Sequence, residues 1–140
     1  MTPTGDRCAV RPEMRERVRR LARAGRLVFG PWYVLADQFL EGAEATVRNL
    51  MIGRALARDF GGAMAEGYNP DSFGSVATMP AILNGFGIRY FNFGRGLAHV
   101  KDRGRKLFWW RWKDGSRVLA MASGYGDGLP LAYPNIGDDI

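Results

Sequence analysis

The sequence predicts an α/β fold, in which helices alternate with parallel strands, followed by a C-terminal β-hairpin. Stretches with apolar residues at helical spacing alternate with short apolar runs, an order typical of parallel strands joined by helices. Near the end of the chain, Asp114 and Gly115 separate two apolar runs, residues 107–112 and 117–121, which is a strong hairpin signal. The 140 residues, 46% of them hydrophobic, correspond to about one globular domain.

The first part of the chain predicts helix, strand, loop and helix in that order. Residues 12–24 carry apolar side chains at helical spacing after a proline that suits a first turn, and a glycine follows them. Residues 27–29, an apolar run between two glycines, predict a buried strand. Residues 31–42 are aromatic and irregular and predict a loop. Residues 43–60 predict a second helix that ends at a pair of glycines.

The second part repeats the alternation before the hairpin. Residues 64–68 predict a short strand, and residues 69–71 a turn, because the residue before a proline disfavours the helical region. A third helix is expected to begin near Thr78, and residues 88–93 predict a further strand. Residues 124–140 are rich in glycine and proline and show no periodicity.

Composition and charge narrow the classes of partner. Cys8 is the only cysteine, so an internal disulfide is excluded, and the sequence is typical of a reducing compartment such as the cytoplasm. No apolar run is long enough to span a membrane. The net charge is +6, and arginines crowd residues 7–26. A solvated helix face is the favoured interpretation, with a nucleic-acid or membrane-surface helix as the alternative, although no aromatic residues interleave with the arginines.

Three predicted loops at the carboxyl ends of strands carry the candidate functional residues. The first contains Trp32 and Asp37, the second Asp71 and Phe73, and the third Arg95. Ligands of α/β sheets bind at this edge, and aromatic rings with carboxylates suit a sugar. Taken alone, the turn at Asp71 is more often an ordinary structural turn than a catalytic site.

Other chemistries have less support in the sequence. His99 is the only histidine, and no acid lies near it at a spacing typical of a catalytic triad. A metal site built from several histidines is therefore excluded for these 140 residues, although aspartates could supply part of one.

A set of short motifs, kept in order along the chain, resembles the catalytic domain of glycoside hydrolase family 38 α-mannosidases of bacterial type. The motifs are residues 30–40 (GPWYVLADQFL), 44–50 (EATVRNL), 68–74 (YNPDSFG), 79–88 (MPAILNGFGI), 93–96 (FGRG), 108–110 (FWW) and 114–119 (DGSRVL). Each motif is weak alone, but the ordered set is specific. The resemblance covers roughly residues 13 to 125, an internal segment of the N-terminal catalytic domain.

The resemblance implies an α/β-barrel-like domain, a retaining mechanism, a bound zinc ion and an α-mannose-containing glycan as substrate. Asp71 would be both the nucleophile and a zinc ligand, and a second carboxyl group would act as acid and base. Trp32, Asp37, Phe73 and Arg95 would contact the substrate.

The chain also departs from the family pattern. An early His-x-Asp pair, a late histidine and the acid/base are missing from these 140 residues, and Ala36, Gln38, Ala43 and Ser75 replace the usual residues. We therefore expect an incomplete catalytic segment that spans residues 1–140, binds zinc weakly, is inactive alone and self-associates through uncovered strands and apolar faces.

Two other hypotheses stay open at this point. The first is a carbohydrate-binding remnant without enzymatic activity, which would use tryptophans at four positions: Trp32, Trp109, Trp110 and Trp112. The second is a basic α/β domain that binds nucleic acid through its arginine-rich helix.

Overall fold

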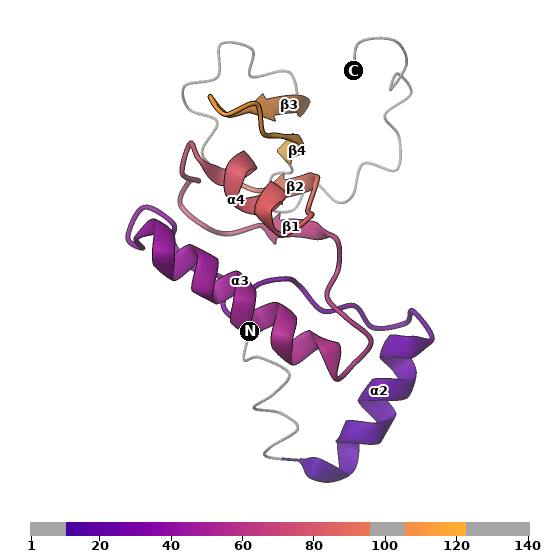
Figure 1. Cartoon of the computed structure of the whole chain (residues 1–140). Coiled ribbons are helices and arrows are strands. Elements are labelled where there is room, and N and C mark those ends of the chain that lie inside the picture. Colours follow the sequence, from indigo (N-terminus) through magenta and orange to yellow (C-terminus); the bar gives the residue numbers. More distant parts are fainter. Residues whose placement is uncertain (1–10, 96–105, 123–140) are drawn as a thin grey trace.

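The computed structural model describes residues 11–95 and 106–122, which form a mixed α/β structure around one four-stranded sheet (Figure 1). In Figure 1 the sheet and helix α2 lie at opposite ends of the view, and helix α3 lies between them. The helices and strands are η1 (Pro12–Met14), α2 (Arg15–Arg23), α3 (Ala43–Arg58), β1 (Glu66–Asn69), α4 (Met79–Gly85), β2 (Tyr90–Phe93), β3 (Leu107–Arg111) and β4 (Arg117–Ala122).

The sheet has the strand order β1-β2-β4-β3, and its first three strands are parallel. Strands β3 and β4 pair antiparallel, with Trp109 opposite Leu119. The turn between them is closed by hydrogen bonds from the Trp112 amide to the Ser116 carbonyl (2.8 Å) and from the Gly115 amide to the Trp112 carbonyl (3.1 Å). The α/β class with parallel strands, predicted from the alternating pattern, is confirmed.

The core lies between one face of the sheet and helices α3 and α4. Its buried members come from these elements and from the link between α4 and β2: Leu50, Met79, Leu83, Ile88, Phe91, Phe93, Val118, Ala120 and Ala122. The rings of Phe91 and Phe93 stack with centroids 5.3 Å apart, and Trp110 packs against both of them. Burial of these large apolar side chains is the main source of stability for the sheet and for the loops at its edges.

The opposite face of the sheet is much less covered. Alternation along the strands places Glu66, Tyr68 and Tyr90 on this face, since Glu66 pairs with Tyr90 across β1 and β2. Tyr68 is 40% exposed and Tyr90 is 56% exposed. Two aromatic side chains, one on the edge strand β1 and one at the start of β2, are therefore partly exposed to solvent.

Several expected boundaries differ from the structure. The buried strand expected at residues 27–29 is wrong, because Val28 is 60% exposed and only Phe29 forms an isolated parallel bridge, with Ala63. Asn69 is the last residue of β1 and not the first of a turn. Ile88 precedes β2, because its amide donates to the Leu83 carbonyl (2.9 Å) and so ends α4.

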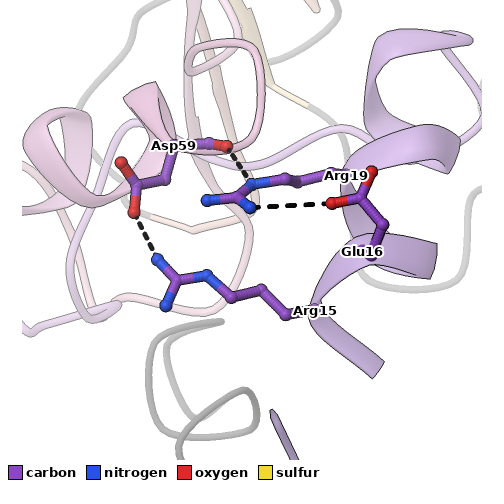
Figure 2. Close-up of polar contacts among 4 residues, drawn as sticks. All are labelled: Arg15, Glu16, Arg19 and Asp59. Carbon is purple, nitrogen blue, oxygen red and sulfur yellow. Dashed lines mark hydrogen bonds and ion pairs between the residues drawn. The ribbon is translucent and has the colours of Figure 1, made fainter. Parts of the chain in front are cut away.

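Ion pairs attach helix α2 to the end of α3 (Figure 2). Arg15 donates to the Asp59 carboxylate (2.6 Å), and Arg19 donates from Nε to the Asp59 backbone carbonyl (3.0 Å). Arg19 also pairs with Glu16 (3.6 Å) and lies over the Phe60 ring (5.9 Å). No residue of α2 is buried, so the arginines form a solvated face whose stems partly cover apolar surface, as favoured from the sequence.

Cys8, His99 and residues 124–140 lie outside the described residues. Among the helices of the described ranges, none has the length and apolar character needed to cross a membrane.

Candidate functional site

The candidate site forms at the carboxyl edge of the parallel strands, where the chain leaves β1 and β2. The two strands end in register, with Asn69 opposite Phe93, and the Gly94 amide donates to the Asn69 carbonyl (3.4 Å). Residues 70–78, which we call the Asp71 loop, follow β1, and Arg95 follows β2. Parallel pairing therefore brings two segments that are distant in sequence to one edge.

Asp71 and Arg95 form an ion pair at this edge. The Arg95 guanidinium donates to Oδ1 of Asp71 at 2.6 Å, and the two side chains are about half exposed. The same guanidinium lies over the ring of Phe73, 4.3 Å from its centroid. Within the described residues, Oδ2 of Asp71 accepts no hydrogen bond, so one carboxylate oxygen is held and the other is open.

Asn69 and Ser72, which flank Asp71 in the chain, form a buried polar cluster. The Ser72 hydroxyl is within hydrogen-bond distance of the Ala36 carbonyl (2.8 Å) and of Oδ1 of Asn69 (2.6 Å), while Nδ2 of Asn69 is buried without a partner. A hydroxyl carries one proton and cannot donate to both oxygens. Rotating the amide by half a turn lets Nδ2 donate to Ser72 while Ser72 donates to Ala36, an orientation that satisfies these groups better.

The loop expected to carry Asp37 contacts the Asp71 loop at two further points. Oδ1 of Asp37 accepts a hydrogen bond from the Phe73 amide (2.8 Å), and Oε1 of Gln38 accepts one from the Val76 amide (3.1 Å). Gln38 is only 3% exposed, so its side chain acts inside the structure.

Helix α3 holds the beginning of that loop in place. The side chain of Asn49 accepts from the Tyr33 and Val34 amides (2.7 and 3.1 Å) and donates to the Val34 carbonyl (2.9 Å). Gly53, one turn further along α3, is in direct contact with the backbone of Pro31 and Trp32, where a Cβ atom would collide. The loop therefore lies directly on α3.

Four of the five residues predicted for the site come together. Asp71, Phe73 and Arg95 form one contact group, and Asp37 joins it through the Phe73 amide. Trp32 instead is half-buried and packs against the core.

The tryptophans proposed for a carbohydrate-binding remnant have other roles in the structure. Trp110 packs against the core, as Trp32 does. Arg117 covers the Trp109 ring at 4.7 Å, and Lys113 lies 5.8 Å from the Trp112 ring centroid. At least two of the four rings are thus used for folding.

The donor atoms near Asp71 do not make up a zinc site. In residues 11–95 and 106–122 no group of three or more His, Cys, Asp or Glu side chains could hold a metal ion. Oδ1 of Asp71 accepts from Arg95 and Oδ1 of Asp37 accepts from an amide, so both oxygens already have partners. Asp71 by itself offers one carboxylate, fewer than the three or four protein ligands that zinc takes.

Strands β1 and β2, which lead to the site, do not supply the second carboxyl group that would act as acid and base. Burial raises the pKa of Glu66 above its ordinary value. However, Glu66 is the first residue of β1 and lies at the amino end of this strand, whereas Asp71 follows its carboxyl end. Its shifted pKa therefore belongs to the packing of the sheet and not to the candidate site.

Sequence reasoning missed the residues that support the site. Gln38, Asn49 and Gly53 act through backbone contacts between segments distant in sequence. A polar residue within an apolar helical stripe, as at Asn49, is the one local signal that could have drawn attention to them.

Comparisons with known proteins place the chain in a family. The model of the glycosyl hydrolases family 38 N-terminal domain matches residues 8–128. A putative mannosylglycerate hydrolase of Halalkalibacterium halodurans is 38% identical over an alignment of 132 residues that covers 85% of this chain and 15% of that protein. Human alpha-mannosidase 2C1 is 34% identical over 111 residues, 77% of this chain and 11% of that protein.

A solved structure agrees with these sequence matches. The crystal structure of an alpha-mannosidase from Enterococcus faecalis superposes with a TM-score of 0.77 at 31% identity, covering 84% of this chain and 14% of that one. The chain thus spans 11–15% of the length of these two curated relatives. The ordered motifs, the family model and the shared fold together show that the chain belongs to glycoside hydrolase family 38 and matches its N-terminal domain.

Proposed function

We propose that the chain is a segment of the catalytic domain of a retaining α-mannosidase and that Asp71 is its nucleophile. The observation that carries the proposal is the position of Asp71 at the carboxyl edge of two parallel strands, with one oxygen held by Arg95 and the other without a hydrogen bond from the described residues. Family membership supports the substrate class, an α-mannosidic bond in a glycan.

The geometry suits a two-step displacement. The open oxygen, Oδ2 of Asp71, would attack the anomeric carbon and form a glycosyl ester as the leaving-group oxygen takes a proton from a second carboxyl group. Water would then cleave the ester and regenerate the carboxylate. Arg95 would fix the orientation of the nucleophile through Oδ1. Phe73, 67% exposed, would offer apolar surface to the sugar ring.

Zinc enters this proposal only in that Asp71 would be one of several ligands of the metal. In a complete site the metal would bind sugar hydroxyls and hold the ring in position. The described residues supply too few donors for it, so we assign no catalytic step of this chain to a metal.

The proposal extends to the architecture and the association of the chain. The three parallel strands with their helices would be one part of a (β/α)-barrel-like layer. The exposed face with Tyr68 and Tyr90, and the exposed apolar residues Met51 and Ile52 on α3, would then be covered in a complete domain. We expect the chain alone to self-associate through these faces, which analytical ultracentrifugation measures directly. A cytoplasmic location and the lack of a nucleic-acid partner stay predictions.

Activity measurements in two contexts test the function. The purified 140-residue chain should not hydrolyse an aryl α-mannoside with or without added zinc. In a chimera, residues 30–95 would replace the aligned segment of the Enterococcus faecalis alpha-mannosidase. The chimera should hydrolyse the substrate, and Asp71→Asn should lower kcat by roughly a thousandfold or more. Turnover by the isolated chain that is lost in Asp71→Ala would contradict the proposed incompleteness, and an active chimera unaffected by Asp71→Asn would contradict the nucleophile.

A further inference from the structure

We propose that residues 36–38 form a positioning element for the Asp71 loop, with Asp37 as a positioning residue that holds the loop backbone. This inference rests on the proposed function only in that the loop carries the proposed nucleophile. The contacts and the experiment that tests them do not depend on that role.

Three successive residues contact the Asp71 loop, each in a different way. The Ala36 carbonyl faces the Ser72 hydroxyl (2.8 Å), Oδ1 of Asp37 accepts from the Phe73 amide (2.8 Å), and Oε1 of Gln38 accepts from the Val76 amide (3.1 Å). The bond to Asp37 involves an ionised acceptor and is therefore stronger than a bond between neutral groups. The two residues that follow Asp71 in the chain are thus both fixed from the same side.

The 36–38 segment can position the loop because it is itself held by another element. Asn49 of α3 binds the backbone of Tyr33 and Val34, only two residues before Ala36. Leu50 of the same helix is fully buried in the core. The Asp71 loop is therefore tied to α3 through the 36–38 segment as well as to β1 through the chain.

Phe39 closes the contact between the two loops. Its ring lies directly on Gly74, which has a φ of +109°, and a Cβ atom at this position would collide with the ring. The backbone conformation disfavours a side chain at residue 74, and a Cβ atom there would also force the Phe39 ring, which is 67% exposed, to move. The two loops thus also touch at residues 39 and 74, next to the three polar contacts.

The result is that Asp71 lies between two independent supports. The 36–38 segment holds its following residues, and Arg95 holds its carboxylate from the next strand (2.6 Å). Asp37 uses one carboxylate oxygen for the loop backbone, which makes it a supporting group whether or not its other oxygen contacts a sugar. A nucleophile fixed from two sides loses little freedom on reaching the reactive geometry.

Amide exchange and carboxyl shifts, measured by NMR on the full 140-residue chain, test this role. In Asp37→Ala the Phe73 amide should exchange about tenfold to a hundredfold faster, as expected when a hydrogen bond to a charged group is lost. The Asp71 carboxyl carbon should shift toward its value in Arg95→Ala, where the ion pair is absent. In Asp37→Asn, whose Oδ1 still accepts but carries no charge, Phe73 exchange should rise less than in Asp37→Ala, and the Asp71 shift should stay close to that of the unchanged protein.

Two further variants make the test specific. Gln38→Ala should speed exchange of the Val76 amide, and Gln38→Glu should preserve it, which gives an independent measure if Asp37→Ala fails to fold. Glu44→Ala removes an exposed ion pair with Arg48 on α3 and should change neither the exchange nor the carboxyl shift. Unchanged Phe73 exchange and an unchanged Asp71 shift in folded Asp37→Ala would overturn the proposal, whatever the chimera shows about the nucleophile.

Discussion

The sheet and helix α2 are held to the rest of the molecule by different forces. The sheet is held by a continuous apolar core in which Phe91, Leu83 and Val118 are almost completely buried. Helix α2 buries none of its residues and is attached through exposed ion pairs, mainly that of Arg15 with Asp59 (Figure 2). Burial of large apolar side chains contributes several times more free energy than an exposed ion pair.

This difference explains why the candidate site lies at the edge of the sheet and not on α2. Asp71 and Arg95 follow strands of the sheet, so their geometry is fixed by the buried core. Helix α2 lies at the opposite end of the view from the sheet in Figure 1, and none of its residues is buried, so no apolar core fixes its arginines in place. Perturbations of the two regions should therefore differ in size, and the following experiments compare them.

The largest effect is expected at the centre of the sheet. Phe91→Ala removes a ring that is 1% exposed and packs on Phe93 and Trp110. We expect the free energy of unfolding to fall by about 3–5 kcal/mol, because the change combines lost burial with a cavity. Urea denaturation measures it. A loss below about 1 kcal/mol would mean that the core does not dominate the stability of the sheet.

A somewhat smaller effect is expected where the first loop lies on α3. Gly53→Ala places a methyl group against the backbone of Pro31 and Trp32 and should destabilise the protein by about 1–3 kcal/mol. Gly85→Ala is the matched control, because a Cβ atom there meets open space. The control should be neutral or slightly stabilising in the same denaturation experiment. Equal effects of the two substitutions would contradict the close contact.

Helix α2 should respond weakly and in a salt-dependent way. Arg15→Ala should cost less than about 1 kcal/mol, and the cost should shrink as salt is added, because both partners are exposed. A double-mutant cycle with Asp59→Ala isolates the pair energy at low and high salt. A coupling above about 2 kcal/mol that persists at high salt would show that α2 is held by more than surface charge.

The smallest effect concerns pH and Glu66. Burial raises the pKa of Glu66 in the folded protein, so the folded state binds the proton more tightly than the unfolded state. The stabilising contribution of the protonated group is present below the unfolded pKa and is lost as pH rises through the folded pKa. Glu66→Gln should therefore stabilise the protein at neutral pH, with a gain that shrinks toward acid pH. A gain independent of pH would contradict the cause.

The sequence predicted the parts of this account that depend on local patterns. Helical periodicity gave α3 and α4 nearly as observed, and Asp114 with Gly115 gave the turn between β3 and β4. The strand expected at residues 27–29 failed because a short apolar run between glycines cannot reveal whether a neighbouring strand pairs with it. Phe29 forms only one bridge.

The sequence could bring four of the five candidate residues to one place but could not predict what supports them. Asp71 and Arg95 could be placed at one edge from strand order, whereas the bond from the Phe73 amide to Asp37 depends on how two loops fold against each other. Periodicity carries no information on such contacts. The sequence predicted a sugar contact for Asp37, which stays a prediction, and it gave no sign of the bond to the loop backbone that the structure shows.

Covalent trapping tests the central claim, that Asp71 is the nucleophile, most directly. A fluorinated mannosyl fluoride, which forms the glycosyl ester quickly and releases it slowly, would be added to the chimera that contains residues 30–95. Trypsin would release residues 59–89 as one peptide, which contains Asp59, Glu66 and Asp71 as its carboxylates. The mass spectrum of its fragments should place the sugar on Asp71. A label on any other residue of an active chimera would contradict the assignment.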